Sequence, residues 1–136
     1  MREIIPNVLW IGNAFDARNV KVVMDAGFQV VVDLAIEESP IQLPREVVYC
    51  RFPLLDGEGN SPVVMKSAID LIGSLVIAKL KTLVACSGGM SRSPLIASAV
   101  IAQVESIDFD DAIRRVTGTG PCDMSPNLYV AIKQLL

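Results

Sequence analysis

The sequence predicts a single α/β domain over residues 1–136, with a mostly parallel central sheet and helices on both sides. Three observations lead to this prediction. Short apolar stretches such as 28–35 (FQVVVDLA) alternate with longer segments of helical periodicity. A strand, a helix and a second strand follow one another at the spacing of a parallel crossover unit. The 136 residues, 51% of them hydrophobic and 20% charged, suffice for one core without disulfides or metal.

Apolar stretches of strand length predict the sheet; in chain order they are 8–11 (VLWI), 28–35, 46–55 (EVVYCRFPLL) and 83–85 (LVA). Gly12 closes the first stretch. The second is rich in valine, which predicts a central strand buried on both faces. Pro53 marks the end of the third, because proline cannot donate to a sheet ladder. The polar, proline-bearing segment 37–44 predicts a loop between the second and third strands.

Segments with apolar residues at helical spacing predict the helices, which are 14–26, 62–80, 94–104, 109–116 and 127–136. Gly27 stops the first helix. The third, PLIASAVIAQV, is apolar nearly all round, which predicts a helix inside the core. On the fourth, the pairs Asp110–Arg114 and Asp111–Arg115 stand in the favourable order at i,i+4, so we expect ion pairs there.

The composition excludes several classes of function. The chain has no histidine, so an imidazole base and a His-bearing metal site are both excluded. The net charge of −3 argues against nucleic acid and anionic membranes as partners, because both favour basic surfaces. The three cysteines, Cys50, Cys86 and Cys122, show no paired spacing, which is typical of a reduced cytosolic protein. We therefore expect a cytoplasmic monomer with no membrane segment, metal or cofactor.

One stretch, 82–93 (TLVACSGGMSRS), predicts a loop that binds oxyanions. An apolar strand ends at Cys86, a pair of glycines follows, and Arg92 opens the next helical pattern. The glycines let the backbone curl so that its N–H groups converge, and such groups at a helix N-terminus attract phosphate, sulfate or arsenate. The candidate anion-binding residues are Ser87, Gly88, Gly89, Met90, Ser91 and Arg92.

The reactive side chains of this stretch have distinct predicted jobs. Cys86 stands beside the positive end of a helix dipole and near Arg92, and both influences favour the ionised thiolate. Arg92 carries a planar fork of donors that holds two phosphoryl oxygens at once. Ser93 is the candidate donor of a proton to the sulfur when it leaves.

The stretch resembles the Cys-x5-Arg signature of the protein tyrosine phosphatases, and CSGGMSRS is most similar to their dual-specificity branch. Residues 5–12 (IPNVLWIG) look like the first strand of that branch, and 125–129 (SPNLY) look like the start of its final helix. The resemblance implies the protein tyrosine phosphatase fold and hydrolysis of phosphate monoesters through a phosphocysteine. It implies a phosphorylated protein or a small phosphate ester as the substrate.

Asp56 is the candidate general acid. The oxygen that departs from phosphorus needs a proton, and a chain without histidine must supply it from another group, of which a loop carboxylic acid is the natural one. Asp56 follows Pro53-Leu54-Leu55 and precedes a Gly-rich loop, the position that matches the general-acid aspartate of the family. Glu58 on the same loop is the alternative acid, and a turn-forming Asp before Gly is the structural alternative.

Ala85 departs from the family pattern, which has His immediately before the cysteine. In the family this His helps to fix the loop and to stabilise the thiolate. A weak or inactive phosphate-binding protein, a pseudophosphatase, is therefore the alternative function, and sulfur transfer by a rhodanese-like domain is a remoter one. Cys50 and Cys122 are candidates for a protective disulfide with Cys86, although core packing is favoured for Cys50.

Overall fold

The computed structural model describes all 136 residues and places five strands in one sheet. The strands are β1 (Arg2–Ile5), β2 (Leu9–Gly12), β3 (Val30–Ala35), β4 (Val48–Leu54) and β5 (Thr82–Ala85). Their order across the sheet is β1-β2-β5-β3-β4. β1 runs antiparallel to β2, and every other neighbouring pair is parallel. The predicted mostly parallel sheet is therefore confirmed.

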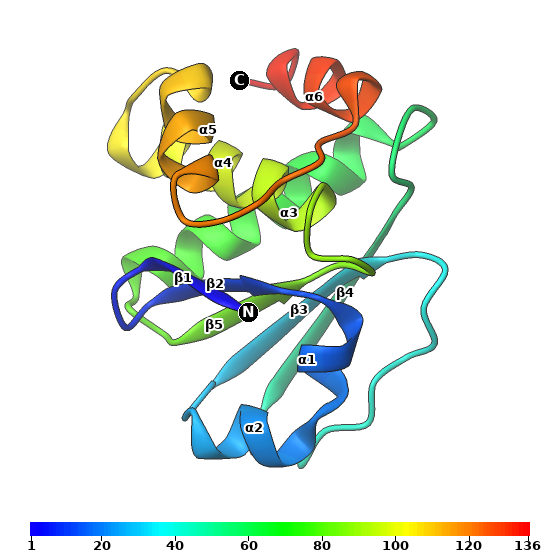
Figure 1. The fold of residues 1–136 in the computed structure, drawn as a ribbon, viewed down its shortest axis with the longest axis vertical. Coiled ribbons are helices and arrows are strands. Elements are labelled where there is room, and N and C mark those ends of the chain that lie inside the picture. The colour runs from blue at the N-terminus through cyan, green and yellow to red at the C-terminus, as the bar shows by residue number, and fades with distance from the viewer.

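Helices cover both faces of this sheet, as predicted (Figure 1); they are α1 (Ala14–Arg18), α2 (Val20–Asp25), α3 (Pro62–Ile77), α4 (Arg92–Glu105), α5 (Phe109–Thr117) and α6 (Pro126–Lys133). α1 and α2 lie on one face and α3 to α6 on the other (Figure 1). Each face buries its own hydrophobic cluster, a larger one of 26 residues under α3 to α6 and a smaller one of 8 that includes residues of α1 and α2. None of the helices has the length and apolar character needed to span a bilayer.

In the first 30 residues one local prediction is wrong, and one strand was not predicted. The segment predicted as one helix over 14–26 is two short helices, because Asn19 ends α1 and its side chain accepts a hydrogen bond from Val22 N–H to cap α2. β1 carries no strand prediction, and it is a four-residue edge strand in which only Ile4 is buried. So short an alternating pattern gives little sequence signal.

Neither predicted ion pair of α5 forms. The Asp110 carboxylate binds Lys133 at 3.0 Å and Tyr129 at 2.6 Å, both on α6. Arg115 binds Glu105 at the end of α4 at 2.7 Å. Arg114 pairs with Asp111, three residues before it on α5. Contacts with α6 and α4 therefore replace the i,i+4 partners of Asp110 and Arg115 only.

The sheet order gathers the ends of the parallel strands at one edge. β5 lies in the middle of the sheet, between β2 and β3, so Cys86 emerges between the segments that follow these two strands. The register sets Ala85, the last residue of β5, beside Gly12 on one side and Asp33 on the other. Parallel α/β sheets bind their ligands at this carboxyl edge.

Candidate active site

The segment 86–91 between β5 and α4, here called the cysteine loop, leaves most of its backbone amides without protein partners. Gly89 N–H donates to Cys86 Sγ at 3.2 Å. No protein acceptor takes the backbone N–H groups of Ser87, Gly88, Met90, Ser91, Arg92 and Ser93. Amides gathered in this way at the N-terminus of a 14-residue helix form an anion-binding arrangement.

The end of β2 holds the cysteine loop in place. Cys86 N–H donates to the Gly12 carbonyl at 3.2 Å, and Ala14 N–H donates to the Ser87 carbonyl at 3.0 Å. Gly89 presses against the same segment with a φ of +73°, and a Cβ built there would lie 3.0 Å from the carbonyl carbon and oxygen of Gly12. Both the positive φ and the close approach require glycine at position 89.

Cys86, only 2% exposed, lines a pocket of about 170 Å³ at this edge of the sheet. The lining residues are Asp56, Cys86, Gly88, Met90, Ser91, Arg92 and Asp123. The fold thus brings the candidate nucleophile, the candidate arginine and the candidate acid into one small space. A larger pocket of about 490 Å³ lies by α4, α5 and the last residues of the chain, but its lining contains no cysteine, serine or threonine.

The Arg92 guanidinium is 4% exposed and is held from two sides. Its Nη1 donates to Glu37 Oε1 at 2.6 Å and to the Leu54 carbonyl at 2.9 Å, and its Nη2 donates to Glu37 Oε2 at 2.6 Å. A guanidinium has five N–H donors in a planar fork. These bonds leave the Nε–H, which has no partner, and one Nη2–H on the same edge. That free edge matches two oxygens of one phosphoryl group.

The charges of Arg92 and Glu37 stabilise each other. Burial alone lowers the pKa of Arg92, but the hydrogen bonds and charge of Glu37, with the charges of Cys86 and Asp56, outweigh it and raise this pKa. The hydrogen bond from Arg92 lowers the pKa of Glu37. Both groups are therefore charged at neutral pH. Sequence reasoning missed Glu37, although its position just after β3, at the same sheet edge as Cys86, was a usable signal.

The Asp56 carboxylate is joined to the cysteine loop by one hydroxyl. Ser91 Oγ donates to Asp56 Oδ1 at 2.6 Å and accepts from Ser125 N–H at 2.9 Å. Asp56 itself is exposed, on the loop that follows β4. The Asn60 side chain closes this loop by binding both the N–H and the carbonyl of Leu55, each at 2.8 Å.

Some predicted residues lie outside the pocket lining. Ser93 is fully buried in the first turn of α4 and its hydroxyl has no hydrogen-bond partner, so no bond to Cys86 is made. Ser87 Oγ donates to Glu38 Oε2 at 3.0 Å. Glu58, the alternative acid, is exposed and does not line the pocket. The predicted role of Ser93 therefore stays a prediction, and Asp56 is the better placed of the two acids.

Asp123 lines the pocket although the sequence does not mark it. It lies on the connection between α5 and α6, and its backbone N–H donates to the Met90 carbonyl at 2.8 Å. Its exposed carboxylate forms no ion pair and no hydrogen bond within the chain. The residue reaches the pocket only through the folded path of the chain, which no local pattern reveals.

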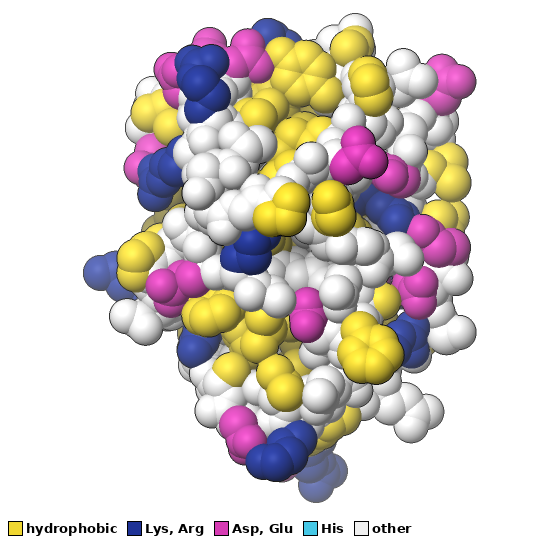
Figure 2. Space-filling view, in the orientation of Figure 1, with side chains coloured by type: hydrophobic (Ala, Val, Ile, Leu, Met, Phe, Trp, Pro, Cys, Tyr) yellow, Lys and Arg dark blue, Asp and Glu magenta, His cyan; other side chains and the backbone are white.

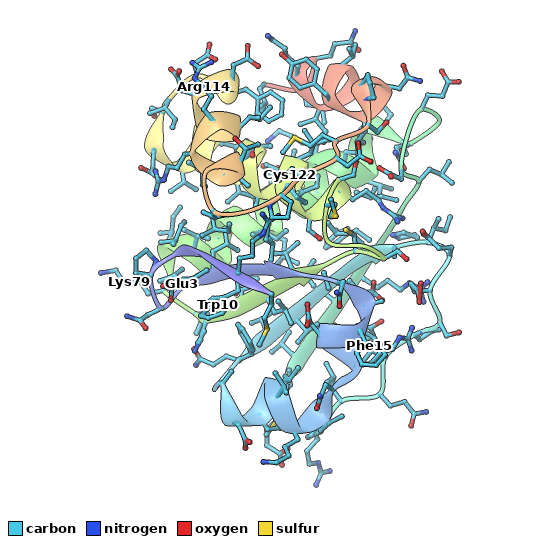
Figure 3. All side chains as sticks on the ribbon, in the orientation of Figure 1. Glu3, Trp10, Phe15, Lys79, Arg114 and Cys122 are labelled. Carbon is cyan, nitrogen blue, oxygen red and sulfur yellow. The ribbon has the colours of Figure 1, made fainter.

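All three cysteines are free. Cys50 on β4 packs against the larger core cluster, and burial raises the pKa of its thiol, which favours a packing role. Cys122 lies in the connection between α5 and α6 (Figure 3), where its Sγ is 3.5 Å from Arg2 Nη2. The same Arg2 nitrogen is 3.5 Å from the Gly89 carbonyl.

Ala85 is 1% exposed and belongs to the smaller hydrophobic cluster, on the α1 and α2 side of the sheet. Its partner in register, Asp33, is also buried. Asp33 Oδ2 accepts from the Tyr49 hydroxyl at 2.9 Å, and Oδ1 accepts from Ala35 N–H at 3.2 Å. Ala85 therefore lies in a buried apolar cluster, beside an aspartate whose two carboxylate oxygens already accept hydrogen bonds.

Sequence comparison connects the chain to known phosphatases, although no family model matches it. It is 26% identical over 136 residues to the dual specificity protein phosphatase Mpk3 of Drosophila melanogaster, covering 98% of this chain and 33% of that protein. It is 28% identical over 129 residues to dual specificity protein phosphatase 22 of Xenopus tropicalis, covering 94% of this chain and 60% of that protein. The chain thus spans between a third and three fifths of the length of the curated relatives it matches.

Solved structures share the fold over nearly the whole chain. Human DUSP28 superposes with a TM-score of 0.86 at 20% identity, covering 99% of this chain and 94% of that one. A human tyrosine phosphatase-like serine/threonine/tyrosine-interacting protein superposes with a TM-score of 0.81 at 20% identity, covering 98% of this chain and 93% of that one. The curated relatives of the chain are thus dual-specificity phosphatases, and its fold is the one that solved structures of such phosphatases have.

Proposed function

We propose that the protein hydrolyses phosphate monoesters on phosphorylated proteins through a phosphocysteine intermediate, without a metal ion. The observation that carries this proposal is that Cys86 and Arg92 line one small pocket, and that the Nε–H of Arg92 has no partner within the chain. The unpartnered amides of the cysteine loop supply the remaining donors. Together they form a bowl of positive potential that suits a tetrahedral dianion.

In the first half-reaction the Cys86 thiolate attacks phosphorus. The S–P bond forms as the P–O bond to the leaving group breaks, and the Asp56 carboxyl gives its proton to the departing oxygen. The free N–H groups of Arg92 and of the loop hold the equatorial oxygens, so catalysis rests on positioning and electrostatics.

In the second half-reaction a water molecule attacks the phosphocysteine. The Asp56 carboxylate takes a proton from this water, the S–P bond breaks, and phosphate leaves with the thiolate restored. On this proposal the Ser93 hydroxyl turns to donate a hydrogen bond to the departing sulfur, which would give that buried donor its missing partner.

The proposed substrates are phosphotyrosine and phosphoserine or phosphothreonine side chains. The variable positions of the cysteine loop, Ser87, Gly88, Met90 and Ser91, carry no positive charge. This composition disfavours substrates with several phosphate groups, such as inositol lipid headgroups. We further propose that the protein acts as a monomer in the cytoplasm.

Hydrolysis of p-nitrophenyl phosphate in the presence of a chelator tests the reaction. Wild-type protein should release nitrophenol, and Cys86→Ser should abolish the release. Cys50→Ala serves as the matched control, because Cys50 packs against the core away from the pocket. Activity that survives Cys86→Ser, or that appears only on addition of Mg²⁺, would contradict the proposal.

A second candidate function, phosphate binding without turnover, is favoured by Ala85. It predicts that a phosphopeptide binds but is not hydrolysed. The pH dependence of Cys86 alkylation separates the two candidates. Alkylation with a midpoint near that of a free thiol, about pH 8.5, supports the binder, whereas a lower midpoint supports the enzyme.

A further inference from the structure

The rim of the pocket is acidic. Asp56 and Asp123 contribute the only carboxylates of its lining, and Arg92 contributes the only cation. Glu37 already neutralises this cation through two hydrogen bonds of 2.6 Å. Arg92 is also 4% exposed with its Nε unpartnered, so an anion remains the expected guest of the pocket. A phosphate that enters is therefore held by N–H groups, with the carboxyl groups of Asp56 and Asp123 beside it.

With Asp56 assigned to proton transfer, Asp123 is the lining carboxylate that can respond to a charge next to the phosphate. A second negative group on the substrate would approach the free carboxylate of Asp123 at the exposed mouth of the pocket. A positive group there would meet the same carboxylate, which has no partner of its own. Unit charges a few ångströms apart near a protein surface interact strongly enough to change affinity by about tenfold.

Exposed apolar side chains surround the same edge of the sheet. Each of the parallel strands β2, β3, β4 and β5 is followed by one, and these are Phe15 (83% exposed), Ile36 (45%), Leu55 (43%) and Met90 (39%). Figure 3 shows Phe15 projecting from α1 at the surface, and in Figure 2 hydrophobic, acidic and basic side chains are interspersed over the visible face.

Residues adjacent to these apolar residues in the sequence belong to the site or contact it. Ala14, beside Phe15, donates to the cysteine loop at 3.0 Å. Ile36 and Leu55 directly precede Glu37 and Asp56 in the sequence. The pocket of about 170 Å³ is smaller than a pocket that encloses a whole small ligand, typically about 300 Å³ or more. The rest of the substrate must therefore lie across the rim, and an extended polypeptide fits an apolar surface of this kind.

We infer that the substrate is a phosphorylated polypeptide segment with a Lys or Arg beside the phosphorylated residue, and that Asp123 selects this positive charge. The inference rests on the proposed function of the pocket as a phosphate site. In this inference Asp123 determines specificity and takes no part in bond breaking. The surface that contacts the substrate then extends from the pocket to Phe15.

Two phosphotyrosine peptides that differ only in an Arg or a Glu beside the phosphotyrosine test the inference. Wild-type kcat/KM should favour the Arg peptide by about tenfold or more, and the ratio should shrink at high salt. Asp123→Asn should lower the ratio severalfold.

Glu46→Gln is the matched control, because it removes an unpaired, exposed carboxylate just before β4, at the opposite end of that strand from Asp56. It should leave the ratio unchanged. Equal wild-type rates, or a ratio that Asp123→Asn does not change, overturn the inference.

A binding experiment separates failure of the inference from failure of the proposed enzyme. The Cys86→Ser variant is titrated with both peptides and fluorescence anisotropy is measured. If wild-type protein hydrolyses neither peptide but the variant binds the Arg peptide about tenfold more tightly, the inference stands and the enzyme proposal falls. If the variant binds both peptides equally or binds neither, the inference falls as well.

A further experiment, with Phe15→Ser and a small phosphate ester, tests whether the positively charged substrate is a polypeptide or a small molecule. This variant should lower kcat/KM for the Arg peptide severalfold and lower that for p-nitrophenyl phosphate less. Phosphoethanolamine carries both charges without a peptide. Its hydrolysis as efficiently as the Arg peptide, with no effect of Phe15→Ser, would overturn the assignment to a polypeptide.

Discussion

The two loops that meet over the pocket are held in opposite ways. The cysteine loop buries Cys86, Gly89 and Ser91, and it is braced by backbone hydrogen bonds to Gly12 and Asp123. Gly89 is also pressed against the end of β2. The loop 55–60 that carries Asp56, here called the acid loop, is mostly exposed and is closed by one Asn60 side chain. A single hydroxyl, that of Ser91, connects the two.

The difference matches the different tasks proposed for the loops. The group that holds phosphate must keep one geometry through both half-reactions, so its backbone is fixed by buried contacts. The acid must release and regain a proton and meet leaving groups of different size, so it is carried on an exposed segment. Substitutions in the two loops should therefore have different effects on stability and on activity.

Gly89→Ala should break the cysteine loop. The new Cβ would lie 3.0 Å from the Gly12 carbonyl, and the φ of +73° would be strained. We expect a loss of about 2 kcal/mol or more in the free energy of unfolding, with no remaining activity. Gly88→Ala is the matched control, because a Cβ there meets nothing within 4 Å. It should change stability by less than about 0.5 kcal/mol in denaturant titration. Equal losses in the two variants would show that the loop is not held as described.

Asp56→Asn should break the acid loop chemically while leaving the fold intact. For phosphate esters with poor leaving groups kcat should fall by about 10² to 10⁴, because the departing oxygen receives no proton. For p-nitrophenyl phosphate, whose leaving group needs little protonation, the fall should be much smaller. Glu58→Gln, on the same loop but outside the pocket, should have little effect on either ester. A larger effect from Glu58→Gln would move the acid role to that residue.

Ser91→Ala should separate the two loops. It removes the only hydrogen bond between the Asp56 carboxylate and the cysteine loop. We expect kcat for poor leaving groups to fall about tenfold, with less change for p-nitrophenyl phosphate. Ser87→Ala is the control, since its hydroxyl donates to Glu38 and lies outside the pocket lining. A purely structural role for Ser91 would slow both esters equally.

Acid should weaken the ion pair between Arg92 and Glu37. Because the pKa of Glu37 is lowered in the folded protein, the pair contributes stability above the ordinary value of 4.5 and loses it as the pH falls through the lower, folded value. The contribution should be under about 1 kcal/mol, since half-exposed carboxylates are screened. Denaturant unfolding from about pH 6 to about pH 3 should show a smaller loss in Glu37→Gln than in wild type. Identical pH dependence would assign the loss to other carboxylates.

The sequence was most informative where function depends on a contiguous segment. Cys86, its glycines and Arg92 share one strand-loop-helix segment, so their residue types alone indicated an anion site and placed it at the end of a buried strand. The mostly parallel sheet followed from apolar stretches alternating with helical periodicity. Asp56 was found through its position after a strand and through the family resemblance.

The rest depended on contacts between distant segments. Glu37 reaches Arg92 from a segment 55 residues away, and Ser125 reaches Ser91 from 34 residues away. Asp110 binds α6 in place of its neighbour on α5, because a packed helix offers a better partner than an exposed turn. Asn19 divides the first helical segment through a cap that hydrophobic periodicity does not register.

The alanine that precedes the nucleophile has a consequence for engineering. An imidazole at position 85 would have to fit within the smaller hydrophobic cluster, where Ala85 is only 1% exposed, and enlarging a buried side chain in this way costs about 1 to 3 kcal/mol. It would also compete with the Tyr49 hydroxyl for the Asp33 carboxylate. Introducing a histidine at position 85 therefore calls for compensating changes in Tyr49 and in the neighbouring helices. The single substitution alone is expected to destabilise the site and not to raise its activity.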